Sequence, residues 1–354
     1  MSVALQDRFS RIVDAVMRDA LIQRNGYVWN RKYEGDPKAG VVKVPVRGAA
    51  TVVSYDKANG ATKSYASGSF ISIAIDKDKA VNEILDGYDA DAVPDDIVAN
   101  RLDAAGFGLA EALNEDGTKT LLDAATVIGQ SSATTNSNVY ARFVDAKTLM
   151  SKAKVPAQGR FALVSPDCMA LVLKSSEFIA ASSLGDEVKE SGAVGRIAGF
   201  LVFEDTSLPD NCNVIFGHPD WCCRIDEWAV DVKLQDLAGS GTYIGASAIQ
   251  GRKVYAHAVT NSKAVYMDSQ VLVPTISEAT ADSTTTITIT AGTNATSVKY
   301  RKGTVSGSTI TWGDWTTYNG SSKPTASATD IIEAYGLDAG GIRSGIVSHT
   351  VTAT

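Results

Sequence analysis

The stretch Gly159-Arg160-Phe161-Ala162-Leu163-Val164-Ser165-Pro166 decides how the middle of this chain folds. Its apolar run predicts a strand over 160–164. Ser165-Pro166-Asp167 then carries the signals of a helix start, and we expect that helix to run through Ala181. Another helix is expected before it, over about 139–153, and apolar runs typical of strands follow at 195–203 and 214–218. This alternation indicates the mixed α+β class.

Towards the N-terminus, the pattern predicts a long helix over 95–117. Pro94 precedes it, and Asp95 and Asp96 favour the positive end of a helix, which explains this carboxylate pair without any acid–base role. Gly117 is expected to end the helix. Gly106 and Gly108 inside it each cost about 1 kcal/mol relative to alanine, which suggests close packing or a bend there.

Two segments nearer the N-terminus look incomplete in isolation. Residues 42–46 and 69–75 alternate like strands, and the polar stretch between them contains the turn signal Asn59-Gly60, so a two-stranded ribbon is predicted. Such a ribbon is only marginally stable in water by itself. Residues 1–30 begin with an amphipathic helix that needs a surface to lie on. Both segments are expected to contact a partner.

The composition changes after Pro274. Short β-rich runs, rich in serine and threonine and separated by turns that contain Gly and Asn, continue to the C-terminus. The pattern predicts a small all-β sandwich over 275–354.

Size and charge limit the possible functions. A chain of 354 residues exceeds one ordinary hydrophobic core, so two unequal domains are expected. The net charge of −7 argues against a protein held on nucleic acid by phosphate contacts, but not against a container for it. The sequence has no apolar run that could span a bilayer and no secretory signal, so we expect a cytoplasmic protein without a membrane. The four cysteines are expected to be free thiols.

No catalytic or metal site can be assembled from the sequence. The three histidines, His218, His257 and His349, are far apart along the chain. His218 with Cys222 and Cys223 lacks the paired spacing of structural zinc sites. Gly239-Ser240-Gly241 lacks the context and the lysine of a phosphate loop, and is interpreted as a turn. We therefore expect no enzyme activity, no cofactor and no metal.

The middle of the chain resembles a known family. The stretch 155–166, the run Gly192 to Phe200, Leu208-Pro209 and the later 249–255 and 264–266 resemble, in order and spacing, the major capsid proteins of tailed bacteriophages with the Hong Kong 97-type fold. The resemblance implies the following layout: an N-terminal arm over 1–30, an extended loop over 31–80, a peripheral domain over 81–138 with its spine helix at 95–117, an axial domain over 139–250, and strands returning to the peripheral domain over 251–272. Residues 275–354 resemble the immunoglobulin-like domains that several phage structural proteins display.

The resemblance implies that the protein is a subunit of a shell. Such a protein assembles with itself into hexamers and pentamers of an icosahedral head that encloses double-stranded DNA without reading its sequence. Portal and scaffolding proteins are the implied partners, and Met1 directly before the arm favours a separate scaffold. The protein would assemble in the bacterial host cytoplasm and end in the virion. The expected contact residues between subunits are Leu5, Phe9, Ile12 and Val16 on the arm and Tyr55, Lys57, Asn59 and Gly60 on the extended loop.

Two alternatives remain open. The same fold could form an encapsulin-type bacterial compartment. In a different class, the protein could be a carbohydrate-binding surface protein, with Trp312, Trp315 and Tyr318 of the tail stacking on sugar rings. The competing interpretation of these three aromatic residues is that they form the core of the sandwich.

Overall fold

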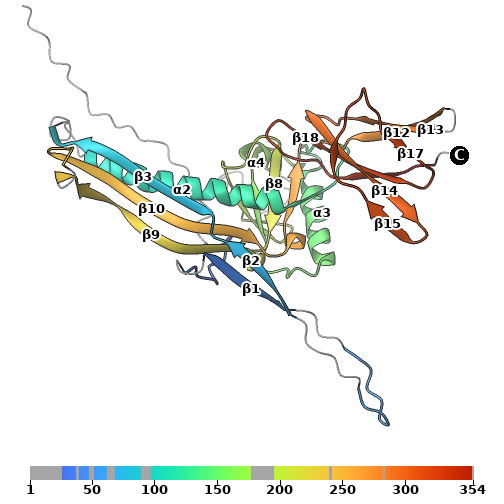
Figure 1. The fold of residues 1–354 in the computed structure, drawn as a ribbon, viewed down its shortest axis with the longest axis horizontal. Coiled ribbons are helices and arrows are strands. Elements are labelled where there is room, and N and C mark those ends of the chain that lie inside the picture. Colours follow the sequence, from blue (N-terminus) through green and yellow to red (C-terminus); the bar gives the residue numbers. More distant parts are fainter. Residues whose placement is uncertain are drawn as a thin grey trace, which may run out of the picture. The chain divides into compact units, whose positions relative to one another are not determined.

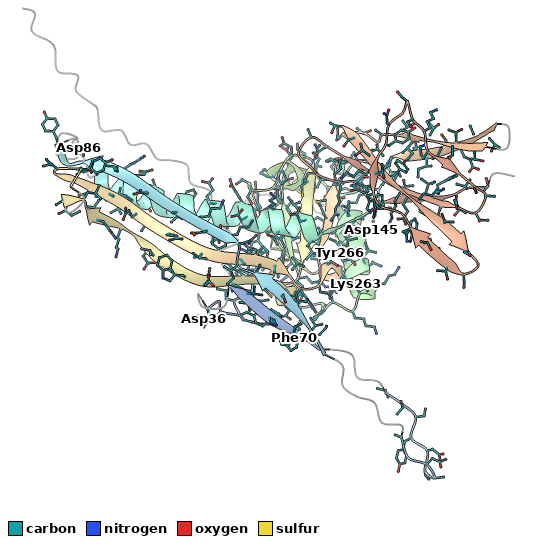
Figure 2. The ribbon with its side chains drawn as sticks, viewed as in Figure 1. Asp36, Phe70, Asp86, Asp145, Lys263 and Tyr266 are labelled. Atoms are coloured by element: carbon teal, nitrogen blue, oxygen red, sulfur yellow. The ribbon has the colours of Figure 1, made fainter. Side chains whose placement is uncertain are left out.

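The structure of the chain is a computed structural model that describes residues 26–36, 40–47, 52–61, 68–88, 97–176, 195–238, 241–281 and 284–352. Two compact units divide the chain. The first contains residues 29–116 and 223–260, and the second contains residues 25–28, 117–222 and 261–354. Figures 1 and 2 show the ribbon and its side chains.

The first unit is a three-stranded antiparallel sheet with a long helix on one face (Figure 1). The sheet has the order β3-β10-β9, and the elements are β3 (Lys77–Asp86), β10 (Ala246–Val259), β9 (Cys222–Asp236) and α2 (Ile97–Ala124). Asp116 of α2 accepts a hydrogen bond of 2.7 Å from the Tyr255 hydroxyl of β10. Arg101 forms an ion pair of 2.8 Å with Glu83 of β3. These contacts fix the helix along the sheet.

The spine helix is longer than the sequence predicts. We expect it over 95–117, whereas α2 continues to Ala124. Gly117 does not end it, because the side chain of Leu121 in the next turn is fully buried and its burial outweighs the cost of a helical glycine. The expected start at Pro94, Asp95 and Asp96 lies outside the described residues.

The predicted ribbon is present, and it is anchored at one end. β1 (Val41–Arg47) pairs antiparallel with β2 (Gly68–Ala74). Val44 and Ile73 are buried against Ile225 of β9 and Ala256 of β10. The base of the ribbon therefore takes its stability from the sheet of the same chain.

The second unit has a six-stranded mixed sheet with the order β4-β11-β8-β5-β7-β6. Its strands are β4 (Thr126–Val127), β5 (Phe161–Val164), β6 (Arg196–Ile197), β7 (Phe200–Glu204), β8 (Cys212–Gly217) and β11 (Tyr266–Ser269), with the short helices η2 (Pro219–Trp221) and η4 (Ser262–Ala264). The deciding stretch forms β5 at the interior of the sheet, parallel to β7 and antiparallel to β8. All four residues of β5 are buried.

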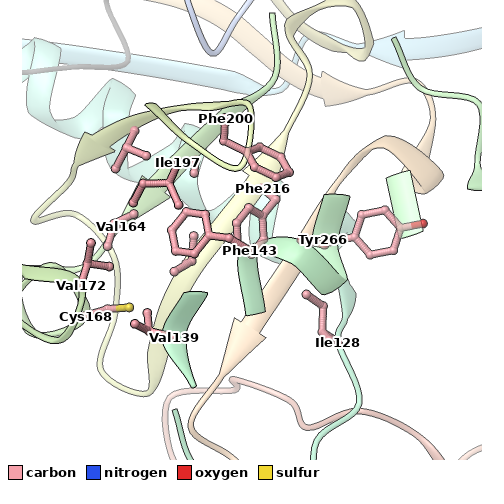
Figure 3. Packing of buried hydrophobic residues seen from close by; sticks show 14 of the residues in the cluster. Ile128, Val139, Phe143, Val164, Cys168, Val172, Ile197, Phe200, Phe216 and Tyr266 are labelled. Carbon is pink, nitrogen blue, oxygen red and sulfur yellow. The ribbon is translucent and has the colours of Figure 1, made fainter. Parts of the chain in front are cut away.

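Helices α3 (Val139–Lys152) and α4 (Pro166–Leu173) contribute to the core of this sheet. Phe143 of α3 contacts Phe216 of β8 edge-on, with ring centroids 5.1 Å apart, and Phe216 lies 5.0 Å from Phe200 of β7. Figure 3 shows this aromatic cluster. Ser165 caps α4 by accepting a hydrogen bond from the Cys168 N–H, as its sequence signal suggests.

Some predicted boundaries need correction. The helix expected through Ala181 ends at Leu173. The apolar run 195–203 is a hairpin, because Ala198 and Gly199 both have positive φ and reverse the chain between β6 and β7.

The axial domain expected over 139–250 also changes. Residues 223–250 belong to the first unit, because β9 and β10 lie in its sheet. The return strands expected over 251–272 divide between the units, since β11 pairs with β8 in the second unit.

The C-terminal segment forms two facing antiparallel sheets around a small core. One has the order β12-β13-β17, the other β15-β14-β18-β19, with β16 also on β14. The strands are β12 (Thr275–Ala281), β13 (Thr284–Thr290), β14 (Ser297–Ser306), β15 (Thr309–Trp312), β16 (Thr316–Thr317), β17 (Thr325–Ala326), β18 (Ile331–Leu337) and β19 (Val347–Thr350). The core is centred on Ile287, Ile332 and Ala334. A β-sandwich was expected here.

The sandwich is attached by specific contacts rather than by a bare linker. Arg343 donates to the carbonyl oxygens of Asp123 and Ala125, just where α2 ends, at 3.1 and 2.6 Å. Asn211 donates to Asp338 at 2.9 Å. A Cβ on Gly345 would lie 2.4 Å from the Cα of Gly129, so the two backbones touch. The Arg343 guanidinium satisfies carbonyl groups that have no partner within the helix at the end of α2.

Candidate assembly surfaces

The arm residues expected to contact neighbours, Leu5, Phe9, Ile12 and Val16, lie outside the described residues. Residues 28–30, at the end of the segment predicted to form the arm, are held by several contacts. Val28 is fully buried and Trp29 is 2% exposed. The Trp29 ring lies 4.6 Å from the ring of His257, and the carbonyl of Asn30 accepts the N–H of Arg224 at 2.9 Å.

The turn predicted at Asn59-Gly60 is closed by backbone hydrogen bonds. Asp56 and Gly60 exchange two backbone hydrogen bonds, of 3.0 and 2.7 Å. The Asp56 carboxylate also accepts from the Ala58 N–H at 3.0 Å and the Asn59 amide at 2.7 Å. These hydrogen bonds hold the pKa of Asp56 below its usual value. Gly60 has φ +74°, a conformation that favours glycine.

The side chains around this turn are exposed. Tyr55 is 74% exposed and Val52 is 92% exposed, and Lys57 and Asn59 face solvent. Phe70 on β2 is 68% exposed (Figure 2). Large apolar side chains on a two-stranded ribbon without a second layer are typical of a surface that is covered in an assembly. Val52 and Phe70 were not among the predicted contact residues, although Phe70 follows the period-two pattern of its strand.

The three tail aromatics divide between the two faces of one sheet. Tyr318 packs on the sandwich core and contacts Tyr300 edge-on at 6.1 Å. Trp312 and Trp315 instead flank the guanidinium of Arg301, at 4.4 and 4.6 Å from its central carbon. A core role therefore fits Tyr318 alone of the three.

The two indoles belong to a built cluster on the outer face of that sheet. Arg301 pairs with Glu333 at 2.6 Å, and Trp315 contacts Tyr335 edge-on at 4.7 Å. Trp312 lies over Gly303, where a Cβ would be 2.7 Å from the indole. Arg301 and Gly303 are two residues apart in β14 and therefore lie on the same face of the sheet, which is the sequence signal for this arrangement.

The four cysteines and His218 are buried. Burial raises the pKa of the Cys168 thiol to about 12. All four cysteines are buried, and none of them forms a disulfide. His218 contacts the Gln158 carbonyl through Nε2 at 2.7 Å and accepts from the Asp220 N–H through Nδ1. Within the described ranges no cluster of His, Cys, Asp and Glu is grouped to hold a metal ion.

One buried carboxyl is notable. Asp268 of β11 is fully buried and accepts from Thr134 and Asn213, both at 2.8 Å. Burial raises its pKa, against the lowering effect of these hydrogen bonds. These hydrogen bonds join β11 to Thr134, which precedes α3, and to Asn213 of β8. Among the described helices, none is long and apolar enough to cross a bilayer.

Comparison with solved structures identifies the fold. A chain from Mycobacterium phage Che8 is 19% identical, with a TM-score of 0.64, and the match covers 76% of this chain and 98% of that one. The capsid structure of the cyanophage P-SCSP1u is 13% identical, with a TM-score of 0.61, over 76% of this chain and 92% of that one. The chain has a phage capsid fold.

A third match is the capsid of a native GTA particle, at 15% identity and a TM-score of 0.55, over 75% of this chain and 95% of that one. No family model matches the chain, and no curated protein matches its sequence. Because these capsid chains are covered almost completely while about a quarter of this chain has no counterpart, the capsid fold here carries an addition.

Proposed function

We propose that the chain is the major capsid protein of a tailed bacteriophage, with the Hong Kong 97-type fold and an immunoglobulin-like domain at 275–354. The observation that carries the proposal is the match over three quarters of this chain to nearly the full length of phage capsid chains. The exposed ribbon supports it, because exposed apolar side chains such as Phe70 make physical sense when neighbours cover them.

In this proposal the mechanism is self-assembly. Hexamers and pentamers form through the second unit, and the arm and the ribbon extend to adjacent subunits. Head-to-tail contacts of this kind form a closed assembly when successive rotations from one subunit to the next add up to a full turn. The protein acts as a structural subunit rather than a catalyst. It encloses double-stranded DNA in the virion, after assembly in the host cytoplasm with a scaffold and a portal.

The test is to express the full chain and examine it by negative-stain microscopy and sedimentation. Closed particles are expected. Deletion of residues 2–24 keeps Val28 and Trp29, so the subunit should stay folded while particles are lost. Normal particles from the truncated chain would contradict the role of the arm. DNA inside particles isolated from a lysate separates a phage head from an encapsulin-type compartment, which would hold protein cargo.

A second role of the tail follows from its outer face. Because Tyr318 packs on the core, a carbohydrate-binding surface would consist of Trp312 and Trp315 with Tyr335. Aromatic faces beside charged groups are suited to sugar rings. A glycan array probed with the full chain tests this, with Trp315→Ala as the binding-site variant and Tyr318→Phe as the control. Equal glycan signals from wild type and Trp315→Ala would remove this role.

A further inference from the structure

The sequence contains three Asn-Gly pairs, at 25–26, 59–60 and 319–320. Such pairs are chemically labile, because glycine has no Cβ that would shield its backbone nitrogen from the asparagine side chain. Asn25 lies outside the described residues. The other two pairs lie in tight turns, and both asparagine side chains are exposed. The hydrogen bonds of these two turns differ at the atoms that react.

The reaction open to an Asn-Gly pair is deamidation without an enzyme. The glycine nitrogen gives its proton to hydroxide from the solvent and bonds to the asparagine Cγ, while Oδ1 takes up negative charge. The Cγ–Nδ2 bond then breaks, and Nδ2 takes a proton from water and leaves as ammonia. A further water molecule opens the cyclic imide and gives aspartate or isoaspartate. Nothing is oxidised or reduced.

At Asn319 the fold favours this reaction. The Ser321 N–H donates to Oδ1 of Asn319 at 3.0 Å, and Oδ1 is the atom that becomes negative. A backbone donor already directed at a developing oxyanion stabilises the transition state. The turn itself is closed by other atoms, since the Ser322 N–H donates to the Asn319 carbonyl at 3.0 Å. Neither hydrogen bond uses the Gly320 nitrogen or Nδ2 of Asn319.

The turn at Asn319 is held on both sides by the sandwich. Tyr318 packs on the core, and its N–H donates to the Val298 carbonyl at 2.8 Å. The Pro324 carbonyl accepts from the Ile287 N–H at 2.9 Å. The folded sandwich therefore keeps the Ser321 N–H against Oδ1, and this orientation does not have to be found anew from many loop conformations.

At Asn59 the reacting atoms are engaged. The Gly60 nitrogen, which would attack Cγ, donates to the Asp56 carbonyl at 2.7 Å. Nδ2 of Asn59, which would leave, donates to the Asp56 carboxylate, also at 2.7 Å. A carboxylate at this distance also opposes a second negative charge on the asparagine oxygen. These contacts all act against ring closure at Asn59.

We propose that Asn319 is a site of spontaneous deamidation, and that Asp56 protects Asn59 from the same modification. Each event at Asn319 replaces a neutral amide of the sandwich with a carboxylate, so the tail gains negative charge with age. The Asn59 amide stays neutral on the extended loop. This chemistry needs only the folded subunit and does not depend on shell assembly.

The first experiment compares the two sites within one chain. Full-length unassembled subunit is incubated at mildly alkaline pH, and mass spectrometry of its peptides measures each deamidation rate. Asn319 should react about tenfold faster than Asn59, because hydrogen bonds and a charge oppose reaction at Asn59. Equal rates, or a faster rate at Asn59, would overturn the proposal.

The same chain unfolded in guanidinium chloride is the reference, because both pairs lose their turn contacts there. The two rates should then become similar. Folding should slow the reaction at Asn59 and should not slow it at Asn319. A slower reaction at Asn319 on folding would mean that the Ser321 hydrogen bond restrains the side chain, and this result would contradict activation by the fold.

Variants at Asp56 test the protection. Asp56→Ala should raise the rate at Asn59 about fivefold, since the Nδ2 contact and the charge are lost, while Asn319 in the same chain serves as the control. Asp56→Asn keeps an oxygen acceptor for the Ala58 N–H and isolates the loss of charge, so its rate should lie in between. An unchanged rate at Asn59 in Asp56→Ala would disprove the protection.

A variant at Gly320 tests the chemical route. A Cβ on Gly320 would meet no described atom within 4 Å, so Gly320→Ala should keep the turn. Its methyl group shields the attacking nitrogen, and the rate at Asn319 should therefore fall about tenfold while the rate at Asn59 stays the same. A Gly320→Ala chain that deamidates at Asn319 at the wild-type rate would exclude ring closure through Gly320.

Discussion

Two strand pairs in this chain have opposite environments. β5 and β8 are buried along their whole length, within a sheet that has further strands on both sides. β1 and β2 pair in equally regular antiparallel register, yet only Val44 and Ile73 are buried, while Phe70 and Val41 are exposed. Backbone pairing is therefore the same, but only the first pair has its apolar side chains covered by its own chain. The difference separates what the subunit needs to fold from what it offers to neighbours.

The largest effect is expected at the aromatic cluster of the buried pair. Phe216 is fully buried, with 0% exposure, and its ring contacts those of Phe143 and Phe200. Phe216→Ala should lower the free energy of unfolding by about 3–5 kcal/mol, because it removes apolar contact and leaves a cavity. Urea denaturation measures this. Tyr140→Ala, an exposed position on α3, is the control and should change little.

A buried arginine next to that sheet comes second. Arg160 is 3% exposed and donates to the carbonyls of Val155 and Pro156 at 2.7 and 2.9 Å, and to Ser151 at 3.2 Å. Arg160→Met should cost about 2–3 kcal/mol, since buried acceptors lose charged donors. The exposed Lys152→Met is the control. Equal unfolding midpoints in urea for the two variants would contradict this account.

The third prediction concerns acid in the first unit. Burial lowers the pKa of His257 to about 4, and neither ring nitrogen has a hydrogen-bond partner in the described chain. Its pKa when unfolded is near 6.5, so the unfolded chain binds the extra proton between these values. Stability should be complete above about pH 6.5 and fall by up to ~3 kcal/mol as the pH drops to 4.

The matched variant for this prediction is His257→Phe, which keeps a ring against Trp29 and Tyr255. Its stability should fall less steeply between pH 6.5 and 4 in a series of urea titrations. The difference between the two chains isolates His257 from the carboxylates, which titrate in both. Parallel pH curves for wild type and variant would rule out His257 as the cause.

The smallest effect on subunit stability is expected on the ribbon. Phe70→Ser removes an exposed side chain, so the free energy of unfolding should change by less than about 0.5 kcal/mol. Particle yield should nevertheless fall. Phe216→Ala should instead lower the stability of the subunit, and should affect particle yield only as a consequence. A ribbon variant that loses stability without losing particles would remove the distinction between the two strand pairs.

Sequence patterns predicted most elements whose burial is decided locally. The ribbon, β5, the cap at Ser165 and the C-terminal sandwich all follow from periodicity and turn residues. Predictions were less accurate where segments far apart in the sequence determine helix length or strand pairing. Gly117 is a helix breaker by propensity, but the buried side chain of Leu121 carries α2 past it. The division of 139–250 between units depends on the pairing of β10 with β3, across more than a hundred residues, with β9 on the other side of β10.

The sequence by itself determined the class of each segment, because hydrophobic period and turn chemistry depend on neighbours along the chain. It also indicated a capsid subunit through the order and spacing of the middle block. Only the tertiary structure decided which apolar side chains are covered. It placed Trp312 and Trp315 outside the core of the sandwich, beside Arg301. Burial is a property of segments brought together from far apart, so no local pattern can specify it.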